Sequence, residues 1–129
     1  MSALTRIILR LARNPDAGFP DGDQERGYVI VAPLDPDHHL DAALWRTAKD
    51  QCTVVRFSPD PDEQADGRLL HRGQSWYFHY DEAREGPDEP VYKLADHRLE
   101  VGEYVTVREA AGDALTYRVT EAVRLHATA

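Results

Sequence analysis

The fold is decided by the stretch Gly67-Arg-Leu-Leu-His-Arg-Gly-Gln-Ser-Trp-Tyr-Phe-His-Tyr80, which predicts a β-hairpin. A two-residue primed turn at Gly73-Gln74 places Arg72 opposite Ser75, and the strands pair outward from there. One face of this hairpin then carries Leu69, His71, Trp76, Phe78 and Tyr80. The other face carries Arg68, Leu70, Arg72, Tyr77 and His79. This alternation predicts that the first face packs in a core and the second meets solvent.

The other apolar segments also alternate with the period of a β-strand. A strand is predicted at Arg6–Arg13, with Ile7, Leu9 and Leu11 on one face and Arg6 and Arg10 on the other. Further strands are predicted at Thr53–Phe57 and Gly27–Ala32, the last apolar on both faces like a central strand. A second hairpin is predicted from Gly102–Arg108 and Ala114–Thr120, and Gly112 is expected to take the left-handed position in its loop. The predicted register turns inward Val105, Val107, Leu115, Tyr117 and Val119, and turns outward Tyr104, Thr106, Arg108, Thr116 and Arg118. A weaker strand candidate is Val91–Leu94.

One segment has helical spacing instead. Leu40–Gln51 is predicted to form a helix with Asp41 as its N-cap, and Leu40 is expected to pack on Trp45. Loops rich in Pro, Gly and Asp separate the elements, at Asn14–Gln24, Pro33–His38, Ser58–Gly67 and Asp81–Pro90. We therefore predict a single domain over residues 1–129, mostly β (α+β), with about seven strands in an antiparallel barrel-like or strongly curved sheet and one short helix.

The composition is that of an acidic protein. The 129 residues carry 23 acids and 15 bases, and the net charge of −8 argues against a generic binder of phosphate backbones. The acids concentrate in the loops, however, whereas most of the 13 arginines fall in predicted strands, so a sheet face can be locally basic. The single cysteine excludes an intrachain disulfide, and no apolar run approaches the roughly 20 residues of a membrane helix. Because the N-terminus does not resemble a signal peptide, we expect a soluble cytoplasmic protein without a membrane partner.

The motifs of known catalytic and metal sites are missing from this sequence. His71 and His79 fall on opposite faces of the predicted hairpin and should not share a metal, although His97, beside Asp96, could approach either. The sequence contains neither a close pair of metal ligands, nor EF-hand spacing, nor a nucleophile elbow, nor a phosphate-binding glycine loop. We therefore predict no metal and no cofactor. A small hydrolase or metal-assisted enzyme that uses His71, His79 or His97 remains an alternative.

The predicted working surface is the outer face of the first hairpin. The predicted ligand-binding residues are Arg68, Arg72, Tyr77, His79, Asp96 and His97. The two arginines would hold an anion or carboxylate, Tyr77 would stack, and the two histidines would tune the charge near neutral pH. The predicted function is a non-catalytic binding or interaction module for a small anion, a peptide or a protein, and a homodimer is also considered.

A second arginine–aromatic face is predicted on the closing hairpin. Tyr104, Arg108 and Arg118 share its outer face. Small barrels hold single-stranded nucleic acid on surfaces of this kind, so binding of nucleic acid is a second alternative.

Several short segments, spread over most of the chain, are similar to a known family. They are Arg13-Asn-Pro, Gly18-Phe-Pro, Gly27-Tyr-Val-Ile-Val-Ala-Pro-Leu34, Leu40-Asp with Trp45, His71-Arg with Trp76, Tyr80-Asp81, Asp96-His97 and Val101-Gly-Glu-Tyr-Val105. On these segments the chain resembles a family of small uncharacterised proteins from alphaproteobacteria and related bacteria. That resemblance implies a bacterial origin but no activity, cofactor or catalytic residue. The closing hairpin also looks like the last hairpin of PUA-like or SH3-like barrels, folds that host many functions.

Overall fold

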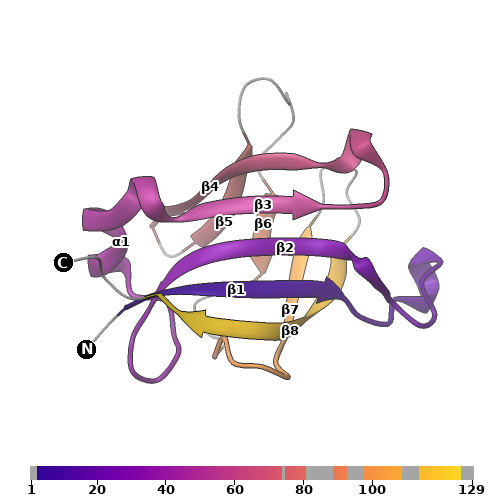
Figure 1. Cartoon of the computed structure of the whole chain (residues 1–129), viewed down its shortest axis with the longest axis horizontal. Coiled ribbons are helices and arrows are strands. Elements are labelled where there is room, and N and C mark those ends of the chain that lie inside the picture. Colours follow the sequence, from indigo (N-terminus) through magenta and orange to yellow (C-terminus); the bar gives the residue numbers. More distant parts are fainter. Residues whose placement is uncertain (1–2, 74, 81–88, 93–97, 109–113, 126–129) are drawn as a thin grey trace.

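Within the described ranges, eight β-strands pair in chain order and close into an antiparallel barrel (Figure 1). The computed structural model describes residues 3–73, 75–80, 89–92, 98–108 and 114–125. The strands are β1 (Ala3–Leu11), β2 (Asp23–Leu34), β3 (Thr53–Phe57), β4 (Ala65–Arg72), β5 (Ser75–Tyr80), β6 (Glu89–Tyr92), β7 (Tyr104–Arg108) and β8 (Ala114–Arg124). Because β8 pairs with β1, the sheet has joined ends. The predicted mostly-β fold with one short helix is confirmed, and β6 covers part of the weaker candidate at Val91–Leu94.

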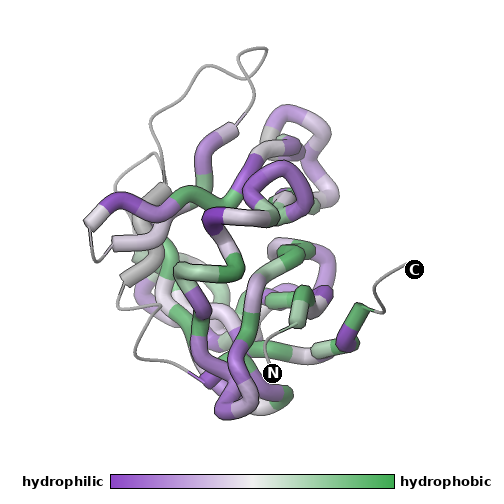
Figure 2. The backbone as a smooth tube through the Cα atoms, turned by 90° about the vertical axis from the view of Figure 1, so that its left-hand side faces the viewer, coloured by the Kyte–Doolittle hydropathy of each residue, from purple (hydrophilic) through white to green (hydrophobic). Residues whose placement is uncertain are grey.

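The core lies inside the barrel, since side chains along each strand alternate between its inner and outer faces. The inward residues predicted for the N-terminal strand and for the closing hairpin are buried: Ile7, Leu9, Leu11, Val105, Val107, Leu115, Tyr117 and Val119. At the centre, the Tyr28 ring lies 4.9 Å from the Phe78 ring and 5.1 Å from the Tyr117 ring. Figure 2 shows hydrophobic and hydrophilic residues interspersed along the backbone.

Both predicted hairpins form in the predicted register. Arg72 lies opposite Ser75 and His71 opposite Trp76 in the first hairpin. In the second, Val107 lies opposite Leu115. Gly73 has a φ of 61°, which the predicted primed turn requires of its first residue. Gln74 and Gly112 lie outside the described residues.

The helix is shorter than predicted. The α-helix α1 covers Ala42–Ala48, and the predicted last turn is a 3₁₀ helix, η2 (Lys49–Gln51). Asp41 is the N-cap, because its carboxylate accepts hydrogen bonds from the backbone N–H groups of Ala43 and Leu44. Trp45 joins the core cluster, against which Leu40 also packs. Two further 3₁₀ helices are η1 (Pro15–Ala17) and η3 (Pro61–Glu63). In the described part of the chain, no helix is both long enough and apolar enough to cross a membrane.

Strand β2 is longer than the predicted Gly27–Ala32 and reaches into the loops predicted on both sides. An irregularity after Arg10 lets Leu11 pair with Asp23, and Pro33 pairs with Leu4 near the other end. The strand is paired on both sides, but only one of its faces is in the core. Val29 and Val31 are half-buried on the outer face because a closed barrel has a single interior.

Gly27 allows β2 to approach β1 closely. A Cβ at this position would lie 1.8 Å from the backbone oxygen of Leu9 and 2.9 Å from the Phe57 ring. We expect Gly27→Ala to lower the free energy of unfolding by about 3 kcal/mol or more, because two backbones must separate. Urea denaturation measures this loss. Gly18→Ala is the control: it meets nothing within 4 Å but has a φ of 90°, and should cost only about 1 kcal/mol. If Gly27→Ala and Gly18→Ala lowered the free energy of unfolding equally, the steric explanation would be wrong.

Candidate functional site

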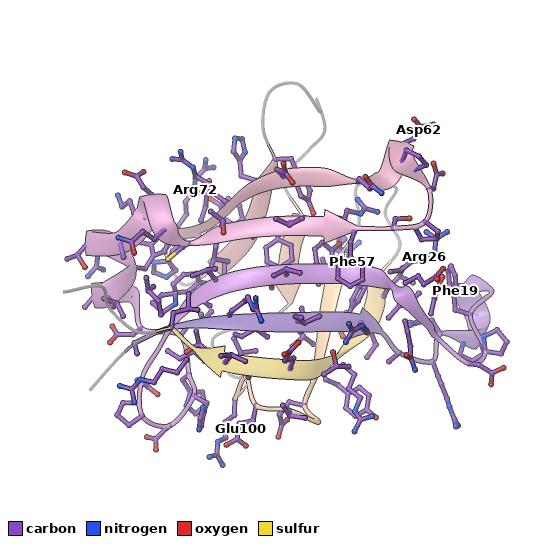
Figure 3. The ribbon with its side chains drawn as sticks, viewed as in Figure 1. Phe19, Arg26, Phe57, Asp62, Arg72 and Glu100 are labelled. Atoms are coloured by element: carbon purple, nitrogen blue, oxygen red, sulfur yellow. The ribbon has the colours of Figure 1, made fainter. Side chains whose placement is uncertain are left out.

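The outer face of the β4–β5 hairpin contains the predicted arginines, but each already has a neighbour. Arg68 lies opposite His79, and its Nη1 atom is 3.2 Å from Oδ1 of Asp50. The Arg72 guanidinium lies over the Tyr77 ring, 5.1 Å from its centroid (Arg72 is labelled in Figure 3). Tyr77 is only 9 % exposed, so little of its ring is accessible for stacking on a ligand. Asp96 and His97 lie outside the described residues.

His71 and His79 lie on opposite faces of this hairpin, as the register predicted. The His71 ring is half-buried and lies 4.3 Å from the Trp76 ring and 5.8 Å from the Trp45 ring. Burial, and secondarily the charge of Arg46, lower the pKa of His71 below its ordinary value. His79 is exposed on the outer face. Among the described residues, no three His, Cys, Asp or Glu side chains come together as a metal site.

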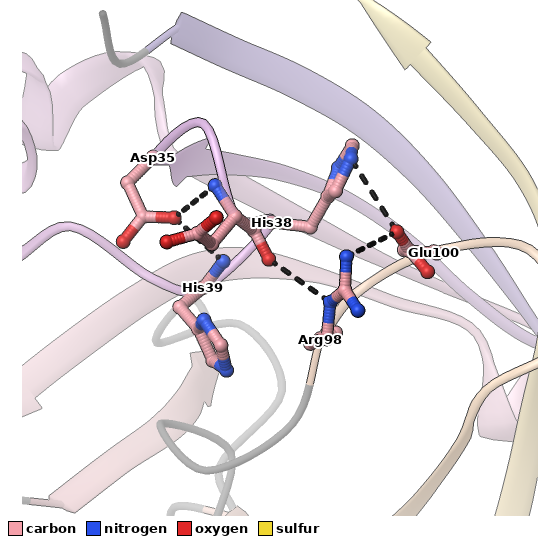
Figure 4. A network of polar contacts seen from close by, with 6 residues as sticks. Asp35, His38, His39, Arg98 and Glu100 are labelled. Atoms are coloured by element: carbon pink, nitrogen blue, oxygen red, sulfur yellow. Dashed lines mark hydrogen bonds and ion pairs between the residues drawn. The ribbon is translucent and has the colours of Figure 1, made fainter.

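A polar network joins the loop after β2 to the segment before β7 (Figure 4). Glu100 lies 3.0 Å from the Arg98 guanidinium and 3.5 Å from Nε2 of His38. Arg98 also donates to the backbone oxygen of Asp37, and the Asp35 carboxylate accepts from the backbone N–H of His39. Arg98 compensates the charge of Glu100, and a backbone N–H group binds the Asp35 carboxylate, so the network serves to hold the loop.

Cys52 is a structural residue. It is fully buried, and burial raises the pKa of its thiol to about 11. The thiol is therefore protonated at neutral pH and is a poor nucleophile. Cys52 thus acts as a small hydrophobic residue of the core cluster.

A groove of about 610 Å³ lies on the outer wall of the barrel, where β1, β2, β7 and β8 meet. Its lining residues are Arg10, Leu11, Ala12, Arg13, Asp21, Gln24, Tyr104, Thr116, Arg118 and Thr120. The lining contains three arginines and one aspartate, so its formal charge is +2. We call this feature the arginine groove. It is a locally positive surface on a chain whose net charge is −8.

The floor of the arginine groove is a cross-strand row. Arg118 on β8 lies directly opposite Arg10 on β1, and directly opposite Tyr104 on β7. Directly opposed residues have Cβ atoms about 5 Å apart, and like charges in such pairs destabilise a sheet. The barrel therefore keeps two arginines side by side at an energetic cost.

The guanidinium groups of the groove lack acidic partners in the described structure. Arg10 is held by neutral groups: its Nη1 donates to Oγ1 of Thr120 (2.8 Å) and its Nε to the backbone oxygen of Gln24 (3.2 Å). Over the described ranges, no carboxylate forms an ion pair with Arg10, Arg13 or Arg118. The groove thus offers donors that match an anion.

Asn14 keeps Arg13 beside β8 after β1 has ended. The side-chain Nδ2 of Asn14 donates to the backbone oxygen of Thr116, and the side-chain Oδ1 of Asn14 accepts from the backbone N–H of Thr116, each at 3.0 Å. The N–H of Ala12 donates to the same Thr116 oxygen. These bonds continue the β1–β8 ladder beyond Leu11, and Arg13 lies between the two clamped residues.

Sequence reasoning found only part of this groove. It grouped Tyr104, Arg108 and Arg118 on one face, and it placed Arg6 and Arg10 on the outer face of the first strand. The structure brings Tyr104 and Arg118 together with Arg10 and Arg13, whereas Arg108 is exposed outside the groove lining. The missing information was the pairing of the first strand with the last.

A smaller cavity of about 130 Å³ opens at the end of the barrel near η1. Phe19, Phe57 and Arg26 line it and point toward one another in Figure 3. The Arg26 guanidinium lies over the Phe19 ring and forms an ion pair with Asp23 at 3.1 Å. Its positive charge is therefore compensated, unlike that of the arginine groove.

Comparisons with protein-family models, with curated proteins and with solved structures found no match to this chain.

The low pKa of His71 predicts a pH dependence of stability. Below pH 6.5, the ordinary pKa of histidine, the unfolded chain takes up a proton that the folded chain resists. Stability should therefore fall as the pH drops below 6.5, until the pKa of the folded state is passed. His71→Phe keeps an aromatic ring at this position but has no group that titrates, so it should remove this part of the pH dependence of stability. Urea unfolding at a series of pH values above and below 6.5 would measure the change. A variant with the wild-type pH dependence would contradict the assignment.

Repulsion between Arg10 and Arg118 predicts a stabilising substitution. Arg118→Glu turns a like pair into an opposite pair and should raise the free energy of unfolding by about 0.5 kcal/mol at low ionic strength, with the gain lost in high salt. Arg68→Glu is the matched control, because Arg68 already pairs with Asp50 and its reversal should destabilise. If both variants lose stability, the arginine pair is not repulsive.

Proposed function

We propose that this protein is a non-catalytic binding module that holds an anionic ligand in the arginine groove. The observation that carries the proposal is the Arg10–Arg118 pair, two directly opposed cations without an acidic partner in the described structure. An anion between them would relieve the repulsion and gain charge-assisted hydrogen bonds. The same contacts that destabilise the sheet would thus favour the bound state.

The chemistry of the groove suits recognition better than catalysis. Arginine stays protonated at every pH that a protein experiences, so it cannot exchange protons with a substrate as a general acid or base does. Its planar fork instead matches the oxygens of phosphate or carboxylate. Thr116 adds a neutral hydroxyl to the lining, whereas the Thr120 hydroxyl already donates to the backbone oxygen of Ile8 and accepts from Arg10. We propose the cytoplasm as the place of action, on the sequence grounds given above.

The hairpin face stays a predicted binding surface, and it serves as the internal comparison. Its Arg68 has a carboxylate partner and its Arg72 lies over Tyr77, so an incoming anion must compete with existing contacts. The groove arginines have no carboxylate partner in the described structure, so an anion can bind there without displacing one. This difference is why we assign the anion to the groove first.

The test is binding of a short polyphosphate chain at physiological ionic strength, measured by calorimetry. Arg13→Gln with Arg118→Gln should raise the dissociation constant at least about tenfold, since each lost charged hydrogen bond contributes about 1.5 kcal/mol or more. Arg68→Gln with Arg72→Gln removes the same charge from the hairpin face and should leave binding unchanged. The proposal would be overturned if only the Arg68→Gln with Arg72→Gln variant lost polyphosphate binding, or if the wild-type protein did not bind polyphosphate.

A further inference from the structure

We infer that the anion in the arginine groove is the phosphate of a nucleotide, whose base stacks on Tyr104. The inference rests on the proposed function and adds the chemical class of the ligand. It starts from the row Tyr104–Arg118–Arg10, in which an aromatic ring and two cations come from three neighbouring strands.

Tyr104 is placed as a stacking platform. Its side chain lies on the outer face of β7 and is 53 % exposed. Among the residues whose side-chain exposure the structure describes, it is the one aromatic residue in the exposed large hydrophobic group, the others being Val55, Val101, Val123 and Leu125. An exposed ring does not contribute the stability that a buried ring would. An exposed aromatic next to arginines is the arrangement by which sheet surfaces hold unpaired bases.

The dimensions of the groove favour a ligand larger than a free ion. Its volume of about 610 Å³ lies in the range of sites for whole small molecules. Neighbouring strands are about 4.8 Å apart, so the row from β7 to β1 spans roughly 10 Å. Within that span the groove changes from aromatic to cationic. A ligand that fills it therefore needs a flat ring at one end and negative charge at the other.

An acidic peptide fits this row less well than a nucleotide. Carboxylates would satisfy Arg10 and Arg118, but they would leave the Tyr104 ring without a matching surface. Every nucleotide carries both a phosphate and a base with a π face, and base–aromatic stacking tolerates any sequence. Duplex nucleic acid keeps its bases stacked in pairs, so it cannot offer one to Tyr104. The row thus favours an unpaired nucleotide, either free or within a single strand.

The experiment compares ligands that separate phosphate from base. Fluorescence or calorimetric titrations would use a thymidine oligonucleotide, a polyphosphate chain with the same number of phosphates, a mononucleotide, a duplex and an oligo-glutamate peptide. The oligonucleotide should bind more tightly than polyphosphate, duplex or peptide. Comparison with the mononucleotide distinguishes a free nucleotide from a strand. Equal affinity for the oligonucleotide and polyphosphate, or a preference for the peptide or duplex, would overturn this inference.

The matched variants are Tyr104→Ala and Tyr104→Phe. Losing the ring should weaken oligonucleotide binding about tenfold, since stacking is worth about 1–3 kcal/mol per base and 1.4 kcal/mol is a factor of ten. Polyphosphate binding should not change, and Tyr104→Phe should bind like the wild type. If Tyr104→Ala leaves oligonucleotide binding intact while Arg118→Gln weakens it, the nucleotide inference fails and the anion-binding function stands. If neither polyphosphate nor oligonucleotide binds the wild type, both fail.

Discussion

The pairing of β1 with β8 is the contact on which both the barrel and the arginine groove depend. It brings together residues as distant in sequence as Arg10 and Thr120, and it turns a curved sheet into a closed one. The same register that buries Leu9 and Val119 side by side sets Arg10 against Arg118 on the outside. Because side chains alternate with a period of two, a slip of one residue would exchange the two pairs between core and solvent. Core and groove are therefore specified by one alignment.

The arginines of this protein differ in what surrounds them rather than in how exposed they are. Arg26, Arg68 and Arg98 each lie about 3 Å from a carboxylate, in Asp23, Asp50 and Glu100. Arg10 and Arg118 are instead directly opposed across β1 and β8. Arg10 is held by a hydroxyl and a backbone carbonyl, which orient its guanidinium without neutralising it. Exposed pairs of the first kind contribute little to stability, whereas an opposed pair of like charge reduces it. A surface that lowers stability while keeping its charges available has the properties expected of a binding site.

Local sequence signals predicted much of the fold and less of the site. The turn glycine at Gly73 and the alternation around it were enough to place His71 opposite Trp76, and Asp41 was found as a helix cap from its own neighbours. The extension of β2 was missed because Asp23 and Pro33 look like loop residues until β1 pairs with them. The burial of Tyr77 was missed too, since a strand's period assigns a face and not what covers it. The sequence could not predict that Arg10 and Arg13 lie beside Arg118, because the pairing of the first strand with the last leaves no local pattern in the sequence.

The net charge of −8 and a positive groove act over different distances. At physiological ionic strength, charges in water are screened over about 8 Å, so an acid farther than this from the groove acts weakly on a ligand bound there. Asp21 is an exception, because it lines the groove. A long polyanion must approach those loops as well, and the total charge opposes it. A short anionic segment meets mainly the three arginines and Tyr104. The charge distribution therefore opposes extended duplexes and favours a ligand that presents a short anionic segment to the groove.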